Sequence, residues 1–576
     1  MAELTFQQMK KLSRADASQL PQYKLAVLGD CATQHLATAI RGYGIHVGVG
    51  LSIFDADYNQ IDAQTMDPDS ELYRFGPNAV LIQMCTEKLY EAFCAVPPDR
   101  RACFAQERCD YIRGIWARIN ANTHTTIMQY NFPLMDDGVF GQLGAKTPDS
   151  FLFQQRKLNF LLMQSCQEVK NVYILDLDAL QTNRGRERFS DPKLYYIAKM
   201  PISLEALPSA VKAVIDMIQA LRGVVKKCLV LDLDNTLWGG VIGDDGISGI
   251  QIGELGTGHA YSDFQRWLKE LKNRGILLAV CSKNNEETAK EPFEKHPEMV
   301  LRLDDFSMFV ANWEDKASNI RRIQQALNIG MDSLVFLDDN PFERNLVRGM
   351  IPEITVPELP EDPAMYLEYL RSLNLFETAS YSAGDAARTR QYREQAQRTA
   401  FESTFQSYDA YLQGLEMKAT VAAFDPFHYP RIAQLTQRSN QFNLRTVRYT
   451  EAEVEAIARD ERHICLYFTL KDRFGDHGLI SVVILDKQED STLFVSQWLM
   501  SCRVLKRGME EFIIDKIIQI ARKHGFRRVI GEYLPTPKNA MVKDLYENMG
   551  FTRADENRFA AEVPSFRYHR TFITEE

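Results

Sequence analysis

The sequence predicts a multidomain α/β protein whose central part is a doubly wound parallel sheet. Three short apolar runs indicate this sheet: residues 228–231, 277–280 and 334–337, each with the length of a buried strand. Helix-length segments separate them, as in sheets whose parallel strands are joined by helices. Polar residues follow each run at once, and open α/β sheets place their chemistry at the carboxyl ends of the strands.

The length of 576 residues predicts several domains, because single hydrophobic cores stop growing near about 250–300 residues. We expect three, at 1–220, 221–376 and 377–576. A hydrophobic content of 45% and a charged content of 25% are ordinary for soluble globular proteins.

The net charge and the cysteine content limit which partners and which cellular compartment we expect. The net charge of −10 argues against nucleic acid as the main partner. The ten cysteines include no Cys-x-x-Cys pair, so they indicate neither a zinc site nor a disulfide framework and fit reduced thiols. No apolar run approaches the ~20 residues that cross a bilayer, and the N-terminus lacks an apolar signal region. We therefore expect a cytoplasmic protein without membrane contact.

The first predicted domain is also an α/β sandwich. Apolar runs at 23–28, 79–82, 126–129 and 172–175 predict strands, and they alternate with helical segments such as 152–170.

Acidic side chains follow two strands of the central sheet. Asp232 and Asp234 follow the first of the three runs, and Asp338 and Asp339 follow the last. Four carboxylates at one sheet edge require a cation, and hard oxygen ligands suit Mg²⁺. Asp232 is thus a candidate nucleophile or metal ligand, and Asp234 a candidate general acid or base. An Asx-rich turn that caps a helix is the alternative interpretation.

Groups that suit phosphate follow the remaining strand. Ser282 lies at the end of the run 277–280, and Lys316 opens a helical stretch to residue 327. Both side chains can donate hydrogen bonds to phosphate oxygens, and Lys283 and Asn284 are further candidates for substrate contact. An aspartyl nucleophile, a metal and a lysine together indicate phosphoryl transfer.

The interval 235–276 leaves no room for a cap domain over this site. Gly243-Asp244-Asp245-Gly246 predicts a hairpin turn, and 259–274 predicts one amphipathic helix. An uncapped site favours macromolecular substrates, or closure by another domain or partner, because charged chemistry gains from the exclusion of water.

The last third of the chain combines strands with helices. Residues 386–399 predict a solvated helix, and 401–414 continue the helical pattern. The expected elements that follow are strands at 464–470, 478–485, 493–500 and 528–533 and helices at 509–524 and 539–551.

The central motifs resemble those of a known superfamily. Asp232-Leu-Asp-Asn-Thr-Leu, with Ser282, Lys316 and Asp338-Asp339, resembles the four motifs of the haloacid dehalogenase (HAD) superfamily. The longer runs from Asp234 to Gly246 and from Phe336 to Arg344 resemble the FkbH-like family. This resemblance implies a Mg²⁺-dependent enzyme that takes a phosphorylated three-carbon acyl donor, such as 1,3-bisphosphoglycerate, and loads a glyceryl unit onto an acyl carrier protein on a separate chain. An acidic carrier would need a local basic patch to dock on this acidic chain.

The same resemblance implies roles for individual residues. The metal ligands would be the Asp232 side chain, the Asp234 backbone carbonyl and Asp338 or Asp339, while Lys316 and Ser282 would hold phosphoryl oxygens. Arg344 would bind an anionic substrate or pin the loop that precedes it. Cys281 would be an acyl acceptor, unless it is a buried core cysteine. The rival functions are a Mg²⁺-dependent phosphohydrolase of a small phosphorylated metabolite and a docking scaffold without activity.

The outer domains carry weaker resemblances. Gly29-Asp30-Cys31 resembles the first block of SGNH hydrolases, with Cys31 in place of the serine. The closing Asp-x-x-His element is missing, which implies an inactive SGNH-like scaffold. Tyr546-Glu-Asn-Met-Gly-Phe resembles the GNAT acyltransferases, but the segment 501–509 has one glycine and three basic residues where those enzymes hold pyrophosphate. This departure favours docking of a carrier or its pantetheine arm over acetyl transfer.

Overall fold

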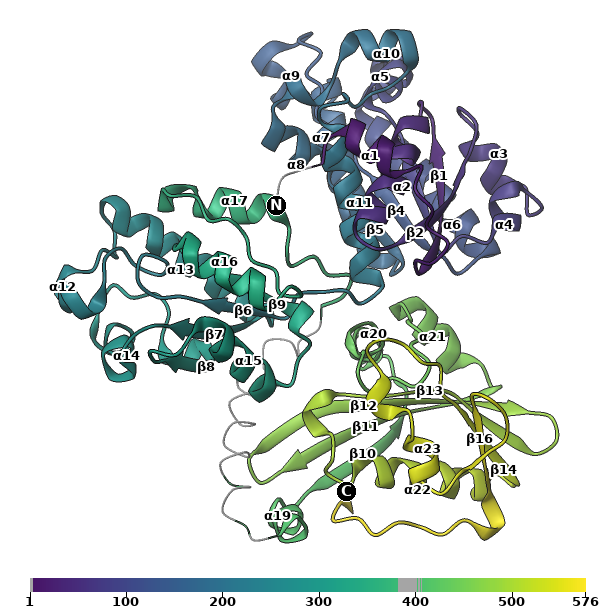
Figure 1. Ribbon diagram of the computed structural model, residues 1–576. Coiled ribbons are helices and arrows are strands. Elements are labelled where there is room, and N and C mark those ends of the chain that lie inside the picture. The colour runs from purple at the N-terminus through teal and green to yellow at the C-terminus, as the bar shows by residue number, and fades with distance from the viewer. Residues whose placement is uncertain (1–3, 382–400, 402–404, 406) are drawn as a thin grey trace. The chain divides into compact units, whose positions relative to one another are not determined.

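The computed structural model describes residues 4–381, 401, 405 and 407–576. The chain forms two compact units that divide between Ile218 and Gln219. The first unit has a five-stranded sheet, and the second has a four-stranded and an eight-stranded sheet (Figure 1). The predicted class, a multidomain α/β protein, is confirmed, while a further division of the second unit at residue 376 stays a prediction.

A parallel sheet with the strand order β2-β1-β3-β4-β5 is the centre of the first unit. On β3, Val80 and Ile82 pack beneath α6 (Phe104–Asn122) and α7 (Phe151–Glu168), while Ala79 and Leu81 are fully buried on the opposite face. Both faces of the sheet are therefore covered, as in the predicted sandwich. The strands are β1 (Gln22–Gly29), β2 (Gly50–Asp55), β3 (Ala79–Gln83), β4 (Thr126–Tyr130) and β5 (Val172–Leu175).

The second unit begins with a parallel sheet in the order β8-β7-β6-β9. Alternate residues of β6 face opposite layers: Leu229 and Leu231 face α13 and α14, while Cys228 and Val230 face α15 and α16. The sheet is therefore doubly wound, as predicted. Its strands are β6 (Cys228–Leu231), β7 (Leu277–Ser282), β8 (Phe306–Ala311) and β9 (Leu334–Leu337). The helices are α13 (Gly256–Asn273), α14 (Glu286–Lys295), α15 (Lys316–Leu327) and α16 (Pro341–Met350).

The hairpin predicted at 243–246 is wrong. This segment lies in the helical element α12 (Ile242–Gly249), which is interrupted at Gly246 with φ of 66°. The carboxylate of Asp245 accepts a hydrogen bond from the backbone N–H of Val241 at 2.7 Å and so stabilises a helical turn instead of a strand pair. Only Gly239 and Gln251, which flank the element, form an antiparallel bridge. Between residues 235 and 276 the chain forms α12 and α13 and no cap domain.

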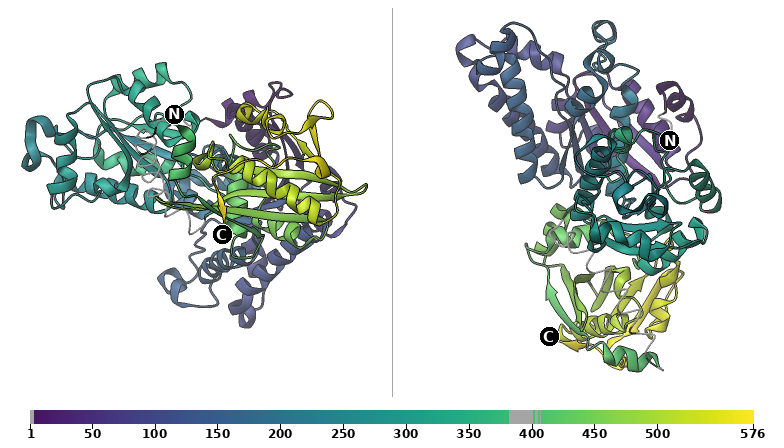
Figure 2. Two further views of the ribbon diagram at one scale, coloured as in Figure 1. Left: turned by 90° about the horizontal axis from the view of Figure 1, so that it is seen from below. Right: turned by 90° about the vertical axis from the view of Figure 1, so that its left-hand side faces the viewer.

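The eight-stranded sheet has helices on both faces (Figures 1 and 2). α22 (Met509–Lys523) packs on one face, and α20 (Tyr429–Arg438) and α21 (Glu451–Arg459) pack on the other. The strand order is β15-β16-β14-β13-β12-β11-β10-β17. The strands are β10 (Lys418–Ala423), β11 (His463–Asp472), β12 (Gly475–Gln488), β13 (Thr492–Met500), β14 (Arg528–Glu532), β15 (Thr552–Arg553), β16 (Arg558–Glu562) and β17 (Thr574–Glu575).

Three helix predictions in this part of the chain have different outcomes. The helix predicted at 386–399 lies outside the described residues. The one predicted at 401–414 is reduced to α19 (Tyr408–Gly414) among the residues described there. The one predicted at 539–551 is split into a 3-10 turn, Ala540–Val542, and the short α23 (Leu545–Asn548).

Two further properties concern the cysteines and the helices. All ten cysteines lie in the described part of the chain, and each is a free thiol. None of the helices that the structure describes combines the length and the apolarity needed for a bilayer crossing.

Candidate active site

Three acidic side chains meet at the carboxyl edge of the four-stranded sheet. Leu231 of β6 lies opposite Leu337 of β9, so Asp232 and Asp338, the next residues of the two strands, are neighbours. The backbone N–H of Asp232 donates to the carbonyl of Leu337 at 3.0 Å and extends the pairing by one residue. Carboxylate oxygens of Asp232, Asp338 and Asp339 all lie within 4.8 Å of one another. We call these three residues the acid cluster.

Lys316 supplies a buried positive charge to the acid cluster. It is the first residue of α15, whose N-terminus is capped by Asp315. Its Nζ lies 2.7 Å from Oδ2 of Asp232 and 2.5 Å from Oδ2 of Asp338. Burial alone lowers the pKa of Lys316, but the charges of Asp232 and Asp338 outweigh this effect and hold the pKa above its ordinary value. Lys316 is therefore a cation at neutral pH.

One lysine does not neutralise the acid cluster. Burial, and then the charge of Asp232, raise the pKa of Asp338 to about 7 and also raise that of Asp339. Oδ1 of Asp232 is buried and has no hydrogen-bond partner. An orphaned carboxylate oxygen beside two further acids is a donor set that fits a hard divalent cation.

The side chain of Asp234 is held apart from the cluster by three donors. Its Oδ1 accepts from Nε1 of Trp238 at 3.0 Å and from the backbone N–H of Ile242 at 2.9 Å. Its Oδ2 accepts from Nδ2 of Asn284 at 2.9 Å. Burial raises the pKa of Asp234. The structure therefore places Asn284 as a positioning partner of Asp234.

The loop between Asp234 and Gly240 is fixed by side chains from distant parts of the chain. Asn235 has φ of 53°, a left-handed conformation that asparagine tolerates. Its carbonyl accepts hydrogen bonds from the hydroxyls of Tyr261, at 3.3 Å, and Tyr366, at 3.2 Å. Thr236 accepts the backbone N–H of Asp339 and donates to its Oδ1. These contacts tie the loop after β6 to the loop after β9.

Arg344 is a structural residue in this arrangement. Its side chain is buried, and its Nη1 donates to the carbonyls of Asp338 and Asp339, both at 2.7 Å. Its Nε and Nη2 contact the carboxylate of Glu358. This is the loop-pinning role, so the expectation that Arg344 binds substrate has no support from its contacts.

Ser282 and Lys283 lie at the end of β7. Ser282 is buried as the last residue of the strand, on the edge that carries the acid cluster. Nζ of Lys283 lies 2.6 Å from Oε1 of Glu343, which is itself buried. The substrate contacts predicted for Ser282 and Lys283 remain predictions.

Cys281 has the environment of a core residue. Its side chain is fully buried on the face of the sheet that packs against α15, and its thiol donates to the carbonyl of Lys316 at 3.7 Å. Burial raises the pKa of this thiol far above its ordinary value. An acyl acceptor must be reachable and able to ionise. The structure therefore corrects the expectation that Cys281 accepts the acyl group and supports the alternative, a buried core cysteine.

Two large apolar side chains are exposed at the sheet edge that carries the acid cluster. Trp313, which is 76% exposed, follows β8 by two residues, and Phe342, which is 69% exposed, lies in the first turn of α16 after β9. Both lie at the carboxyl edge of the sheet. Exposed aromatic residues around an open site are typical of an interaction surface.

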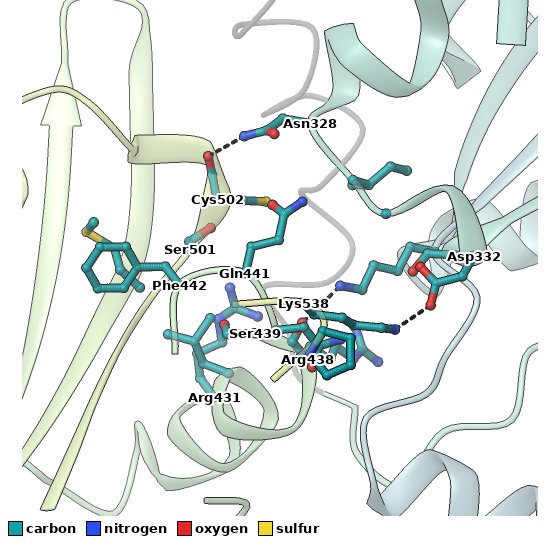
Figure 3. Close-up of a pocket in the computed structure, with 18 residues that line it drawn as sticks. Asn328, Asp332, Arg431, Arg438, Ser439, Gln441, Phe442, Ser501, Cys502 and Lys538 are labelled. Carbon is teal, nitrogen blue, oxygen red and sulfur yellow. Dashed lines mark hydrogen bonds and ion pairs between the residues drawn. The ribbon is translucent and has the colours of Figure 1, made fainter. Parts of the chain in front are cut away.

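A cavity in the second unit is a different site (Figure 3). It measures about 300 Å³, and Lys227 and Ser333, which line it, precede β6 and β9. It therefore lies at the amino edge of this sheet, away from the acids. Ser501 and Cys502 of the loop predicted to dock a carrier also line it. Its charged lining residues are Lys227, Asp332, Arg431, Arg438 and Lys538, a balance that favours an anionic ligand.

Some residues that position the site could not be found from the sequence. Thr236 and Trp238 lie in the first motif, but their partners, Asp339 and Asp234, follow only from the fold. Tyr366 lies 131 residues from Asn235, and no local pattern signals that contact. Glu343 carried the one usable signal, as an acid next to Arg344 in the last motif.

Comparisons with known proteins agree with this geometry. Residues 24–219 match the family model described as the N-terminal domain of FkbH. Among solved structures, the chain is similar to the N-terminal part of the protein BF1531 from Bacteroides fragilis, which contains a phosphatase domain and is complexed with Mg. The two are 50% identical, and the match covers 66% of this chain and 100% of that chain with a TM-score of 0.63.

Other similarities are weaker. The ribosomal-protein-S18-alanine N-acetyltransferase from Escherichia coli is 16% identical, with 25% of this chain and 94% of that chain covered and a TM-score of 0.20. The spermidine N-acetyltransferase from Vibrio cholerae is 14% identical, with 26% and 96% covered and a TM-score of 0.21. These identities and TM-scores are too low to support an inference about this chain. No curated protein has a significant sequence match to this chain.

Proposed function

Because this chain belongs to the FkbH-like family, we propose that its HAD-type site is a Mg²⁺-dependent centre that dephosphorylates a three-carbon acyl donor during the loading of a carrier protein. The donor would be a glyceryl phosphate such as 1,3-bisphosphoglycerate, and the product a glyceryl thioester on an acyl carrier protein. The observation that carries the proposal is the acid cluster itself, in which Asp232 and Asp338 both contact one buried lysine, Lys316.

The overall reaction requires two different bonds to be broken. To form the thioester, the carrier thiol attacks the acyl carbon, its proton leaves to a base, and the acyl phosphate departs as inorganic phosphate. The donor still carries a phosphate ester at its other end, which a glyceryl unit lacks. This ester needs attack at phosphorus, and a buried aspartate with a second aspartate two residues later suits that step.

The residues of this chain divide that second step between them. A carboxylate oxygen of Asp232 attacks phosphorus, and the phosphate ester bond breaks. Asp234, whose pKa is raised by burial, passes a proton to the departing alkoxide and later takes one from the water that hydrolyses the aspartyl phosphate. Lys316 and Ser282 hold phosphoryl oxygens in place.

The Mg²⁺ ion of this proposal fits the acid cluster. Asp232 through its orphaned Oδ1, a carboxylate of Asp338 or Asp339, and the backbone carbonyl of Asp234 would hold it. When bound, Mg²⁺ supplies positive charge that offsets the repulsion between the carboxylates and the phosphate. The complex of BF1531 with Mg supports this assignment.

The open edge of the sheet supports a macromolecular acceptor. No cap domain is present between residues 235 and 276, and Trp313 and Phe342 expose aromatic rings at the same edge of the sheet. A carrier protein that covers these rings would bury apolar surface and exclude water from the reaction. Since Cys281 is buried, the thiol that receives the acyl group is the one on the carrier.

The experiment is incubation of the full chain with Mg²⁺, 1,3-bisphosphoglycerate and a phosphopantetheinylated carrier, followed by mass spectrometry of both proteins and a phosphate assay. A glyceryl adduct on the carrier supports the proposal. A phosphoglyceryl adduct with Asp232→Asn, where the unchanged chain gives a glyceryl adduct, assigns the second step to the acid cluster.

The alternative is a Mg²⁺-dependent phosphohydrolase of a small phosphorylated metabolite. Phosphate release at the same rate with and without carrier, and no adduct, favours this alternative. If neither phosphate release nor an adduct is observed, the remaining alternative is a docking scaffold without activity. A matched control is Asp304→Asn, in which an acidic residue outside the acid cluster is changed and turnover is expected to stay the same.

A further inference from the structure

A second cluster of ionisable side chains lies in the first unit, at the carboxyl ends of β1 and β3. These strands are parallel neighbours, and Gly29 lies opposite Gln83. The residues that follow them, Asp30 and Cys31 on one side and Cys85 on the other, therefore come together although 54 positions separate the two cysteines in the sequence. The backbone N–H of Cys85 donates to Oδ1 of Asp30 at 2.9 Å and fixes the two loops together.

The three side chains present a compact donor set. A carboxylate oxygen of Asp30 and the Sγ atoms of Cys31 and Cys85 all lie within 4.8 Å of one another. The cysteines are 1% and 3% exposed. Two sulfur atoms and one carboxylate oxygen are the ligand types of Zn²⁺ and other thiophilic divalent cations, which form four-coordinate complexes.

A buried hydroxyl beside the cluster gives further support. Tyr195 packs against Cys31 and Cys85, the residue is 6% exposed, and its hydroxyl lies near the Cys85 thiol without a hydrogen bond of normal geometry. Burial of an unsatisfied donor destabilises the fold. A thiolate ligand, or a water bound to the metal, would accept its hydrogen. Oε2 of Glu87, two residues after Cys85, is likewise buried and unpartnered, and a nearby divalent charge would stabilise it.

We propose that Asp30, Cys31 and Cys85 form a binding site for a thiophilic divalent cation such as Zn²⁺, separate from the Mg²⁺ centre. Asp30 and Cys85 also line a cavity of about 230 Å³, through which solvent or a small ligand can reach the fourth coordination position. Three protein ligands with one open position are the arrangement of catalytic zinc sites, whereas structural sites are closed by four protein ligands.

The test is titration of the full, reduced, metal-free chain with Co²⁺ in excess Mg²⁺, which occupies the carboxylate site. We expect a thiolate-to-cobalt charge-transfer band that saturates at one Co²⁺ per chain and is lost when Zn²⁺ displaces Co²⁺. Cys31→Ser and Cys85→Ser should each remove the band. The matched control is Cys109→Ser, which changes a cysteine of the same unit that is equally buried but contacts Ser165, and it should keep the band.

The proposal is overturned if the unchanged chain gives no band, or if the double variant of Cys31 and Cys85 keeps it. Should the serine variants fail to fold, X-ray absorption of the chain loaded with one Zn²⁺ decides. Two sulfur neighbours at about 2.3 Å support the site, and a shell of oxygen and nitrogen alone contradicts it.

Discussion

Replacement of Lys316 by methionine tests the electrostatic basis of the acid cluster. The substitution keeps an unbranched side chain of similar length but removes the positive charge of Nζ, which contacts both Asp232 and Asp338. Lys316 is 3% exposed and Asp338 is fully buried, so water cannot replace the lost cation. Removal of one partner from a buried ion pair costs about 3–5 kcal/mol, because the other charge is left uncompensated. We expect a loss of this size in the free energy of unfolding without Mg²⁺.

The measurement is urea unfolding of the full chain with and without Mg²⁺, followed by tryptophan fluorescence, to which the buried Trp238 beside the site contributes. Because a divalent cation at the cluster offsets the same carboxylates, Mg²⁺ should restore a measurable part of the loss. The control is Lys290→Met, which removes a helix-surface pair with Glu286 and should cost only about 0.3–0.5 kcal/mol.

The reasoning is refuted if Lys316→Met loses less than about 1 kcal/mol without Mg²⁺, the size of an exposed pair. It is also refuted if the loss is the same with and without Mg²⁺, since the acids would then not share a cation site.

Three further predictions concern the same site. A proton on Asp338 competes with the cation, and the pKa of Asp338 is about 7 in the metal-free fold. The affinity for Mg²⁺ should therefore fall as pH drops from 7 to 6, by at most about tenfold. Calorimetry should find a weaker dependence of Mg²⁺ affinity on pH in Asp338→Asn. Arg344→Lys should weaken Mg²⁺ binding by about 10–100-fold, because the hydrogen bonds from Arg344 to the carbonyls of Asp338 and Asp339 are lost. Circular dichroism should show unchanged secondary structure. Cys281→Ala should still load the carrier and should lower the free energy of unfolding by about 1 kcal/mol, whereas loss of loading in a folded variant would restore Cys281 as acceptor.

Three of the four strands of the central sheet were predictable because they are buried on both faces, whereas the edge strand β8, which is only partly buried, was not predicted. Strands buried on both faces are continuous apolar runs, and β6, β9 and α15 lie where the runs and the helical spacing place them. The strand β2 was not predicted, since it lies at an edge of its sheet and alternates less clearly between buried and exposed residues. The turn at Gly246 was misjudged because the capping carboxylate of Asp245 decides between hairpin and helix, and that contact depends on backbone geometry.

The candidate site was predictable as a set of residue types and less so as a set of contacts. Asp232, Lys316 and Asp338 follow from strand ends that must share one sheet edge. The side on which Cys281 points depends on the register of β7, where it and Ser282 face opposite layers, and the sequence left this open. The pairing of Cys31 with Cys85 depends on the neighbourhood of β1 and β3, which no spacing rule for cysteines contains.

The hydroxyl of Tyr366 has a consequence for where the catalytic unit can be cut. Tyr366 belongs to α17 (Tyr366–Leu373), which follows every motif of the HAD type in the sequence. Its hydroxyl nevertheless donates a hydrogen bond to the carbonyl of Asn235, in the loop that follows Asp232. A fragment that stops after α16 would contain all the signature residues and still lack this hydrogen bond. Sequence motifs alone would therefore set the limit of a minimal active fragment too early.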